Sequence, residues 1–389
     1  MPFRRSTNPS GGYSANNSVR LIRGGSPYFD ALEMLIDQAK ETIHFQVYIM
    51  ESDETGMRIS NALMRAAGRG VRVYVLLDGY ASSALSEQVV NDFRTAGIHF
   101  RWFEPLFKGH NFFVGRRMHH KVIVADNANA LVGGLNITNR YNDMPDEPAW
   151  LDWAVLASGD VCIELYNRCL QMWYRRPPAD HSKPVMRKPS GDRLVRVRIN
   201  DRVRNKDQIS RSYLEMFRGS HEHITIMSSY FMPGRVFRKQ LRLASGRGIK
   251  IRIILTKISD VTIAKQAERF FYPWLLRRNV EIYEYRKKVL HGKMASCDGQ
   301  WVTVGSYNFN DLSAYASIEL NLDIKDPIFS NDVELAFSKI MKDDCDRITS
   351  ESFTHNTHWW NLAIYRSAYA LCRLLLLVFT FSFSNKRHR

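Results

Sequence analysis

Apolar residues recur with helical spacing over residues 29–39, and the chain then turns to a run rich in β-branched and aromatic residues over residues 42–49. The same order returns later, where a helical pattern over residues 213–218 precedes a strand pattern over residues 224–230. Helices that alternate with β-branched strands are typical of α/β layers, in which helices cover the faces of a sheet. The pattern therefore predicts two α/β units.

The two units are copies of one another. Residues 66–77 read AAGRGVRVYVLL and residues 244–255 read ASGRGIKIRIIL, and each run predicts the end of a helix, a glycine turn and a strand. Self-similarity at such a long spacing indicates a duplicated structural unit. At 389 residues the chain also exceeds what one hydrophobic core of ordinary size supports. We therefore expect two similar α/β halves, each a β-sheet flanked by helices.

Composition sets the limits of these halves. A stretch rich in proline and charge begins at Arg175 and is typical of a linker. The amino terminus is polar and has no apolar segment behind its first arginines, so it predicts neither a signal peptide nor a membrane anchor. The expected divisions are a flexible tail at residues 1–18, a first half at 19–176, a linker at 177–195, a second half at 196–348 and a carboxyl-terminal tail at 349–389.

Charge narrows the choice of partner. The chain has 55 Lys and Arg against 39 Asp and Glu, a formal net charge of +16. Such a surface attracts polyanions, and both nucleic acid and an anionic membrane qualify. The five cysteines form no C-x-x-C pair and no zinc-finger spacing, which fits a reducing compartment.

One motif, His-x-Lys-x4-Asp, occurs late in each unit, and an asparagine follows the histidine by 17 residues in both copies. The first copy comprises His119, Lys121, Asp126 and Asn136, and the second comprises His291, Lys293, Asp298 and Asn308. A histidine and a lysine two positions apart on a strand project from the same face. A turn at the aspartate then leads into a second strand towards the asparagine, so a hairpin brings the three side chains together.

These side chains suffice for phosphodiester transfer without a metal or a cofactor. One imidazole attacks phosphorus to form a phosphohistidine, and the other protonates the leaving alcohol and later deprotonates the incoming one. The lysines and asparagines hold the non-bridging oxygens. The sequence therefore predicts a catalytic set of two histidines and two lysines, with Asn136 and Asn308 binding the substrate phosphate.

Each histidine also needs a carboxylate that sets its protonation state and orientation. Glu319, on the strand predicted after the second motif, is the candidate for His291. Asp152 is the corresponding candidate for His119. The motif aspartates Asp126 and Asp298 belong to the catalytic signature, but at their turns they point away from the histidines, and we expect them to be structural charge partners.

An ordinary structural interpretation is also open. In a single motif the histidine could be a half-buried strand residue and the lysine a surface cation whose stem packs on apolar neighbours. Two copies with the same interval in a duplicated unit favour chemistry instead.

The two motifs, with their Gly-Gly-Leu-Asn and Gly-Ser-Tyr-Asn followers, resemble the signature of the phospholipase D superfamily over nearly the whole chain. The segments LLDGY at residues 76–80, YFMPG at 230–234, EYR at 284–286 and LHGK at 290–293 are similar to the bacterial cardiolipin synthase branch that lacks amino-terminal membrane helices. Two departures are His120, where relatives commonly place arginine, and Gln46, where a carboxylate is frequent in the synthases.

The resemblance implies a fold and an activity. The two halves would pack about a pseudo-twofold axis with one active site between them and no metal. A phosphatidyl group would pass from one phosphatidylglycerol to a second, with release of glycerol. Similarity to members with two motifs assigns the nucleophile to His119. The oligomeric state stays open.

The carboxyl-terminal tail indicates contact with a membrane. It contains Trp359, Trp360, Tyr365 and Tyr369, then an apolar run over residues 374–383 and a basic end with Lys386, Arg387 and Arg389. The apolar run is too short to span a bilayer, which needs about 20 residues. An in-plane anchor on the cytoplasmic side of the bacterial cell membrane is the favoured interpretation, with aromatic side chains at the headgroups and cations on anionic lipid. The alternative is a helix packed on the protein's own core.

Two other functions use the same residues. A phospholipase D hydrolase would accept water in place of an alcohol. A nuclease or DNA-end phosphodiesterase would suit the positive charge, but the apolar tail argues against it, and small nucleases of the superfamily carry one motif per chain. We therefore expect a phospholipid substrate and an anionic membrane surface as partners, and no nucleic acid.

Overall fold

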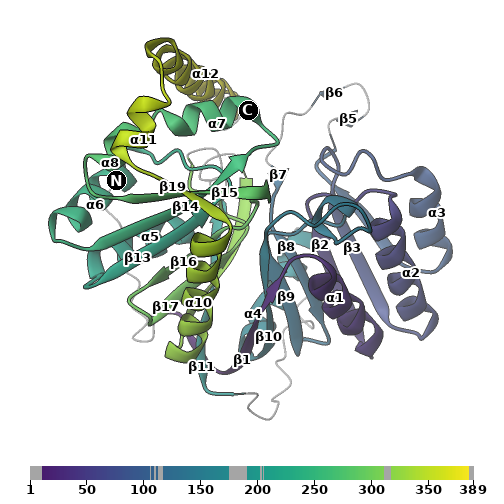
Figure 1. Cartoon of the computed structure of the whole chain (residues 1–389). Coiled ribbons are helices and arrows are strands. Elements are labelled where there is room, and N and C mark those ends of the chain that lie inside the picture. Colours follow the sequence, from purple (N-terminus) through teal and green to yellow (C-terminus); the bar gives the residue numbers. More distant parts are fainter. Residues whose placement is uncertain are drawn as a thin grey trace.

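The protein is an α/β molecule of two similar halves (Figure 1). The computed structural model describes residues 11–105, 107–108, 111–112, 117–174, 191–201, 204, 206–310 and 317–384. Within these ranges the strands pair into one sheet of 17 strands and a separate two-stranded hairpin.

The first half contains residues up to the end of helix α4. Its main strands are β1 (Ser14–Arg23), β2 (Thr42–Val47), β3 (Arg72–Asp78), β4 (His99–Phe103), β8 (Lys121–Ala125), β9 (Asn129–Gly133) and β10 (Trp153–Gly159), and its short strands are β5 (Phe107–Lys108), β6 (Asn111–Phe112) and β7 (Arg117–Met118). Its helices are α1 (Ser26–Gln38), α2 (Glu54–Gly68), α3 (Glu87–Thr95), α4 (Asp160–Trp173) and the 3-10 turn Asn139–Tyr141. The main strands pair in the order β4-β3-β2-β8-β9-β10-β1, parallel up to β2 and antiparallel from there.

The second half repeats this plan. Its strands are β11 (Arg193–Asp201), β12 (Lys206–Asp207), β13 (His223–Ser228), β14 (Lys250–Ile258), β15 (Glu281–Val289), β16 (Met294–Cys297), β17 (Trp301–Gly305), β18 (Ser317–Lys325) and β19 (Cys345–Ile348). Its helices are α5 (Gln208–Gly219), α6 (Arg235–Gly246), α7 (Thr262–Arg269), α8 (Tyr272–Leu276) and α10 (Pro327–Asp343). The strands pair in the order β15-β14-β13-β16-β17-β18-β11, with β19 added beside β15.

The two sheets join at equivalent strands. β1 of the first half pairs antiparallel with β11 of the second, with Ser14 opposite Val195 and Asn17 opposite Arg193. Because equivalent strands that meet antiparallel are related by a twofold rotation, the join lies on the pseudo-twofold axis of the molecule. The predicted duplication and the expected axis are therefore confirmed.

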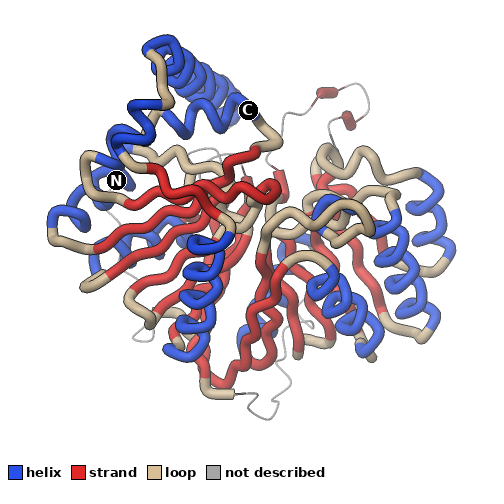
Figure 2. The backbone as a smooth tube through the Cα atoms, in the orientation of Figure 1, coloured by secondary structure: helices blue, strands red, loops and turns tan. Residues whose placement is uncertain are grey.

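The three largest hydrophobic cores among the described residues hold the layers together. One lies between the sheet of the first half and α1 to α3, and a second lies between the sheet of the second half and α5, α6 and α8. The third contains α4, α10 and residues of both sheets, such as Val124 and Val155 with Leu322 and Met227. Figure 2 shows the strands running through the middle of the molecule with helices at both ends. The shared core keeps the two halves in one fixed arrangement.

The motif hairpins form as the sequence predicts. Asp126 and Asn127 both adopt positive φ at the turn between β8 and β9, as do Asp298 and Gly299 between β16 and β17. Asp126 accepts hydrogen bonds from the backbone N–H groups of residues 40, 41 and 42 at 2.8, 2.8 and 2.9 Å. Asp298 accepts the equivalent three at 2.8 to 2.9 Å from residues 221 to 223. The aspartates have structural contacts, as expected, and these are to backbone amides at the start of β2 and β13 and in the two residues before each strand.

Two predicted boundaries are wrong. Residues 14–18 of the predicted flexible tail belong to β1, where the side chain of Asn17 is fully buried. Residues 193–195 of the predicted linker begin β11. Both errors have one cause: the two strands pair with each other across the halves, and this pairing leaves no mark in local composition. Most of the linker, residues 177–190, lies outside the described residues.

The carboxyl-terminal tail forms α11 (Ser350–His355) and α12 (Trp359–Ser384). Tyr365 is buried, and the ring of Tyr369 stacks on Phe270 with centroids 4.7 Å apart, so these two aromatics follow the alternative of packing on the core rather than facing headgroups. Other apolar side chains of α12 are exposed, namely Trp359, Trp360, Leu362, Ile364, Leu371, Leu374 and Leu375. The predicted basic end, residues 386–389, lies outside the described residues. Among the described helices, none combines the length and the apolar character that crossing a bilayer requires.

We predict that Asp298→Asn lowers the free energy of unfolding by about 1–2 kcal/mol at neutral pH, because the three amides lose a charged acceptor that is only partly screened by solvent. Burial raises the pKa of Asp298, but the three backbone hydrogen bonds outweigh it and hold the pKa below its usual range. This stabilisation is present above the carboxyl pKa of the unfolded chain and is lost as pH falls through the lowered folded value. Urea unfolding should therefore show a gap between wild type and variant that closes in acid. An equal midpoint at pH 7 would contradict the structural role.

Candidate active site

The first motif histidine lies where β7 ends and β8 begins. β7 pairs with β18 of the other half, and the backbone N–H of His119 donates to the carbonyl oxygen of Ile318 at 3.0 Å. This pairing places Glu319 beside the imidazole, with His119 Nδ1 and Glu319 Oε2 2.9 Å apart. The carboxylate behind the first histidine therefore comes from the second half.

The second motif repeats this arrangement in reverse. The backbone N–H of His291 donates to the carbonyl oxygen of Leu151 in the first half at 2.7 Å. Asp152 follows directly, and its Oδ2 lies 2.6 Å from His291 Nδ1. Both carboxylates are fully buried.

The structure corrects the predicted pairing. Glu319 orients His119 and not His291, and Asp152 orients His291 and not His119. The sequence predicts that each carboxylate serves the histidine of its own half, but β18 with Glu319 and the segment before β10 with Asp152 each pair with the other half. The chain intervals carry no information on this crossing, because the two copies have the same order of elements.

The residues after the motif strands make room for these carboxylates. A Cβ atom at Gly134 would lie 2.5 Å from both carboxylate oxygens of Asp152, so the close approach requires glycine. The equivalent residue in the second copy is Ser306, whose Oγ donates to Glu319 Oε2 at 2.6 Å. The residue at this equivalent position therefore supports the histidine–carboxylate pair in each copy, as glycine in the first and as serine in the second.

The two lysines are almost completely enclosed, each with 1% of its surface exposed. Lys121 Nζ donates to the backbone oxygen of His119 at 2.6 Å and lies 4.9 Å from the centroid of the Tyr48 ring. Lys293 Nζ donates to Ser229 Oγ at 3.1 Å and to the backbone oxygen of His291. Burial lowers the pKa of Lys121 to about 7 and that of Lys293 to about 8. The charge of Lys293 lowers the pKa of Lys121 further, which places the two ammonium groups in one site.

The imidazoles are held neutral. Burial lowers the pKa of His291 to about 4, with Lys293 acting in the same direction and Asp152 opposing both. Burial likewise lowers the pKa of His119, opposed by Glu319 and assisted by Lys121 and Lys293. A neutral imidazole beside a carboxylate donates its Nδ1–H, so each Nε2 keeps its lone pair. The lysine of the second half acts on the histidine of the first, so the two motifs form a single site.

The asparagines differ between the copies. Asn136 Oδ1 accepts the backbone N–H of Ile49 at 3.2 Å, and its Nδ2 donates to the Tyr141 hydroxyl at 2.9 Å. Asn308 is also buried, but within the described part of the chain its Oδ1 has no hydrogen-bond partner.

Several side chains at the site were not predicted from the sequence. Tyr48 and Ser229, which contact the two lysines, occupy equivalent positions directly after β2 and β13, so an alignment of the two copies beyond the motifs would have indicated both. The ring of Tyr141 meets His291 edge-on at 5.1 Å. Tyr230 donates to Asp260 Oδ1 at 2.5 Å.

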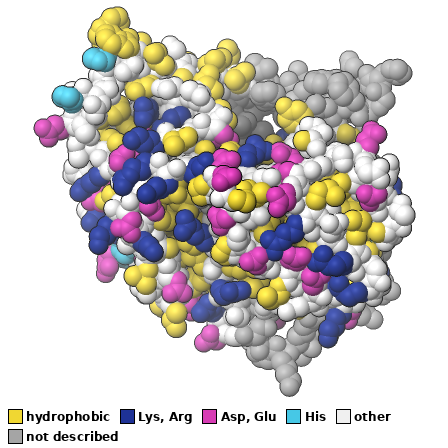
Figure 3. All heavy atoms as spheres, turned by 45° about the vertical axis from the view of Figure 1, so that its right-hand side comes forward, with side chains coloured by type: hydrophobic (Ala, Val, Ile, Leu, Met, Phe, Trp, Pro, Cys, Tyr) yellow, Lys and Arg dark blue, Asp and Glu magenta, His cyan; other side chains and the backbone are white. Residues whose placement is uncertain are grey.

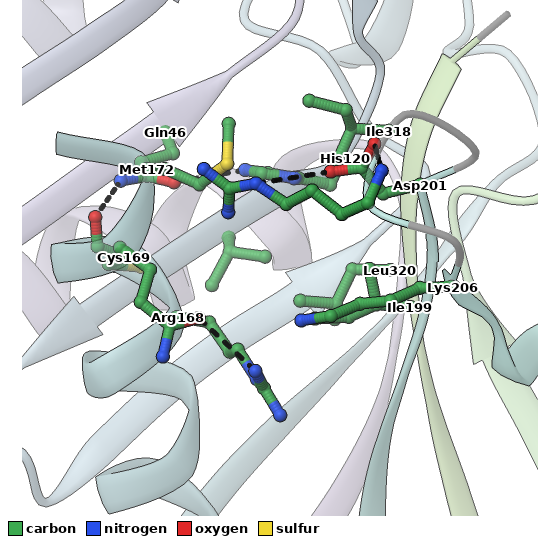
Figure 4. Close-up of a pocket in the computed structure, with 13 residues that line it drawn as sticks. Gln46, His120, Arg168, Cys169, Met172, Ile199, Asp201, Lys206, Ile318 and Leu320 are labelled. Atoms are coloured by element: carbon green, nitrogen blue, oxygen red, sulfur yellow. Dashed lines mark hydrogen bonds and ion pairs between the residues drawn. The ribbon is translucent and has the colours of Figure 1, made fainter. Parts of the chain in front are cut away.

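The two departures from the family pattern lie behind the site (Figure 4). His120 points to the opposite side of the strand from Lys121, as expected, and its Nε2 lies 3.0 Å from Gln46 Oε1. Gln46 Nε2 donates to the backbone oxygen of Cys169 at 2.9 Å. Both line a pocket of about 20 Å³ beside α4, where burial lowers the pKa of His120 to about 3. Their side chains bond to each other and to the backbone of α4.

The described residues contain no group of three or more His, Cys, Asp or Glu side chains placed to hold a metal ion.

Comparison with known proteins identifies the family. The family described as "Cardiolipin synthase, PLD-like domain" matches residues 32–162 and again residues 213–341, which are the two halves of the fold. The chain belongs to this family. The resemblance inferred from the motifs is thereby confirmed.

Relatives in the cardiolipin synthase family cover most of the chain. Cardiolipin synthase B of Shigella flexneri and that of Escherichia coli strain K12 are both 34% identical over 358 residues, covering 89% of this chain and 85% of theirs. Among solved structures, phosphatidylserine synthase of Haemophilus influenzae superposes with a TM-score of 0.72 over 92% of this chain and 93% of its own, at 13% identity. This last likeness shows a shared fold.

We predict that Glu319→Gln lowers the pKa of His119 and leaves that of His291 nearly unchanged, whereas Asp152→Asn does the reverse. The reason is that each carboxylate raises the pKa of the imidazole it contacts, and its removal leaves burial and the lysines unopposed. Titration of the ring resonances by nuclear magnetic resonance measures both values. A shift of His291 in Glu319→Gln would contradict the crossed pairing.

Proposed function

We propose that the protein is a cardiolipin synthase that transfers a phosphatidyl group from one phosphatidylglycerol to another and releases glycerol. The observation that carries the proposal is the pair of complete histidine–carboxylate units that face two buried lysines across the join of the halves. Membership of the cardiolipin synthase family supports the reaction class.

In the first step, Nε2 of one histidine attacks the phosphorus of phosphatidylglycerol and forms an N–P bond, while the P–O bond to the glycerol headgroup breaks. The second histidine, in its imidazolium form, gives its proton to the departing glycerol oxygen. In the second step, this histidine takes the proton from a hydroxyl of the second phosphatidylglycerol, whose oxygen attacks the phosphorus. The new P–O bond forms as the N–P bond breaks, which releases cardiolipin and the free nucleophilic histidine. We assign the attack to His119 and the proton transfers to His291.

The buried lysines bind the reacting phosphodiester. Two ammonium groups in an enclosed site repel one another, and a bound phosphate anion would compensate both charges. The same anion would raise the pKa of His291, whose value of about 4 in the free site keeps the ring neutral. The negative charge of the bound substrate would thus allow His291 to become protonated. His291 could then give this proton to the leaving group. Asn136 and Asn308 would donate to the non-bridging oxygens.

We also propose that the protein acts as a peripheral protein on the cytoplasmic side of the bacterial membrane. The exposed apolar side chains of α12, with Trp359 and Trp360 at its start, support attachment in the plane of the bilayer surface. The net charge of +16 adds attraction to anionic lipid.

We predict that His119→Ala and His291→Ala each lower cardiolipin formation by about 10³-fold or more, because nucleophile and acid cannot replace one another. The assay incubates labelled phosphatidylglycerol vesicles with enzyme and identifies products by mass. Cardiolipin and glycerol are expected from wild type, and phosphatidic acid alone would indicate a hydrolase instead. Quenching in alkaline denaturant, in which an N–P bond survives, should trap the phosphoenzyme in His291→Ala but not in His119→Ala, and the reverse result would exchange the two roles.

We predict that kcat/KM falls as pH rises through about 7 to 8, because Lys121 and Lys293 lose their charge as pH passes their lowered pKa values of about 7 and about 8. Lys121→Arg should have lower activity but an alkaline limb moved upward, since a guanidinium stays protonated. The measurement is a pH profile on short-chain phosphatidylglycerol at fixed ionic strength. A profile that stays flat up to roughly pH 10, where a free lysine titrates, would exclude the buried lysines as the groups responsible.

A further inference from the structure

The segment that runs from the end of β14 to the start of α7 exposes three apolar side chains within six residues. Ile258, Val261 and Ile263 have 49%, 41% and 37% of their surface exposed. Large aliphatic side chains that gather on one surface segment indicate a contact with another apolar phase. We call residues 258–263 the apolar rim.

The apolar rim lies at the active site. Asp260, in its middle, accepts the hydroxyl of Tyr230, and the neighbouring Ser229 binds Lys293. The charge of Asp260 also raises the pKa of Lys293 against the effect of burial, so the carboxylate and the catalytic lysine are close in space. The rim therefore contains both Asp260, which contacts Tyr230 beside the site, and apolar side chains that are exposed to solvent.

The apolar rim is also next to α12. Its last two residues start α7, and α7 and α12 pack along each other, with Tyr369 of α12 stacked on Phe270 just beyond α7. Figure 1 shows α12 lying over α7 at the top of the molecule, and Figure 3 shows hydrophobic side chains gathered in the same region. Leu371, Leu374 and Leu375 of α12 are exposed there. The rim and α12 thus contribute apolar side chains to neighbouring parts of one surface.

We propose that the apolar rim enters the surface of an anionic phospholipid bilayer and holds the mouth of the active site against the lipid headgroups. The proposal rests on the proposed function, because a substrate with two acyl chains reaches the site at least cost if its chains never leave the bilayer. Val261 and Ile263 would lie among the upper acyl groups while Asp260 remains with the headgroups.

Charge favours a bilayer as the occupant. The net charge of +16 draws the whole molecule to an anionic surface. Lys257, which directly precedes the rim, is partly neutralised, since its Nζ lies 2.6 Å from Asp346. Local ion attraction is therefore weak, and the apolar side chains supply the contact at the rim itself. This part of the binding should resist salt, because apolar burial is not screened.

The test replaces the apolar groups without adding charge. Val261→Ser/Ile263→Ser should lower partition of the full chain onto phosphatidylglycerol–phosphatidylcholine vesicles by about tenfold, at low and at high salt. Val261 is the N-cap residue of α7 and Ile263 lies in its first turn, where serine is well tolerated, so the fold should be kept. In the opposite direction, Val261→Trp should strengthen the partition, and a spin without vesicles separates this gain from aggregation. Sedimentation with vesicles measures all variants.

The matched control is Ile328→Ser/Leu335→Ser on α10, whose side chains are 67% and 61% exposed and belong to no site described above. A general loss of surface hydrophobicity would affect this pair at least as strongly as the rim pair. The proposal is overturned if the rim pair binds vesicles like wild type, or if both pairs lose binding equally. Cardiolipin formation is measured in a separate assay. If wild type makes cardiolipin but the rim pair binds vesicles as wild type does, only the proposal about the rim is rejected. If the rim pair loses vesicle binding but wild type forms no cardiolipin, only the proposed synthase activity is rejected.

Discussion

Each motif histidine is held by a carboxylate from the opposite half, and this crossed pairing is the constraint on which the candidate site depends. His119 needs β18 of the second half for both its backbone hydrogen bond and Glu319, and His291 needs the segment before β10 for the same two contacts. Neither half alone can therefore orient its own imidazole. The antiparallel join of β1 and β11 and the core shared by α4 and α10 fix the distance across which the exchange occurs. The orientation of both imidazoles therefore depends on how the two halves pack.

The interior of the site carries positive charge that the protein itself compensates only in part. Lys121 and Lys293 are buried within reach of each other's field, and burial alone makes a charged lysine costly. The two carboxylates oppose this effect, but each is already engaged with a histidine. A phosphodiester anion would complete the balance, because it would compensate both ammonium charges.

The two copies have diverged around a common frame. The lysine of the first half lies over the ring of Tyr48, whereas that of the second half binds the hydroxyl of Ser229. Gly134 yields space to Asp152, whereas Ser306 adds a hydrogen bond to Glu319. Asn136 is engaged with Ile49 and Tyr141, whereas Asn308 keeps an unpaired oxygen in the described part of the chain. These differences give the two histidines unequal surroundings, which is the physical basis on which a nucleophile and an acid can be distinguished.

The sequence by itself determined the duplicated α/β plan, the two hairpins with their His, Lys and Asn, and the structural role of Asp126 and Asp298, because strand alternation and turn chemistry act over a few residues. It also marked Glu319 and Asp152 as the buried carboxylates of the site. Only the tertiary structure decided which carboxylate serves which histidine, that residues 14–18 and 193–195 belong to strands, and that Tyr365 and Tyr369 pack on the second half. Each of these depends on pairing between segments far apart in the chain. Such pairing follows from how two sheets meet about an axis, and local patterns of polarity carry no record of it.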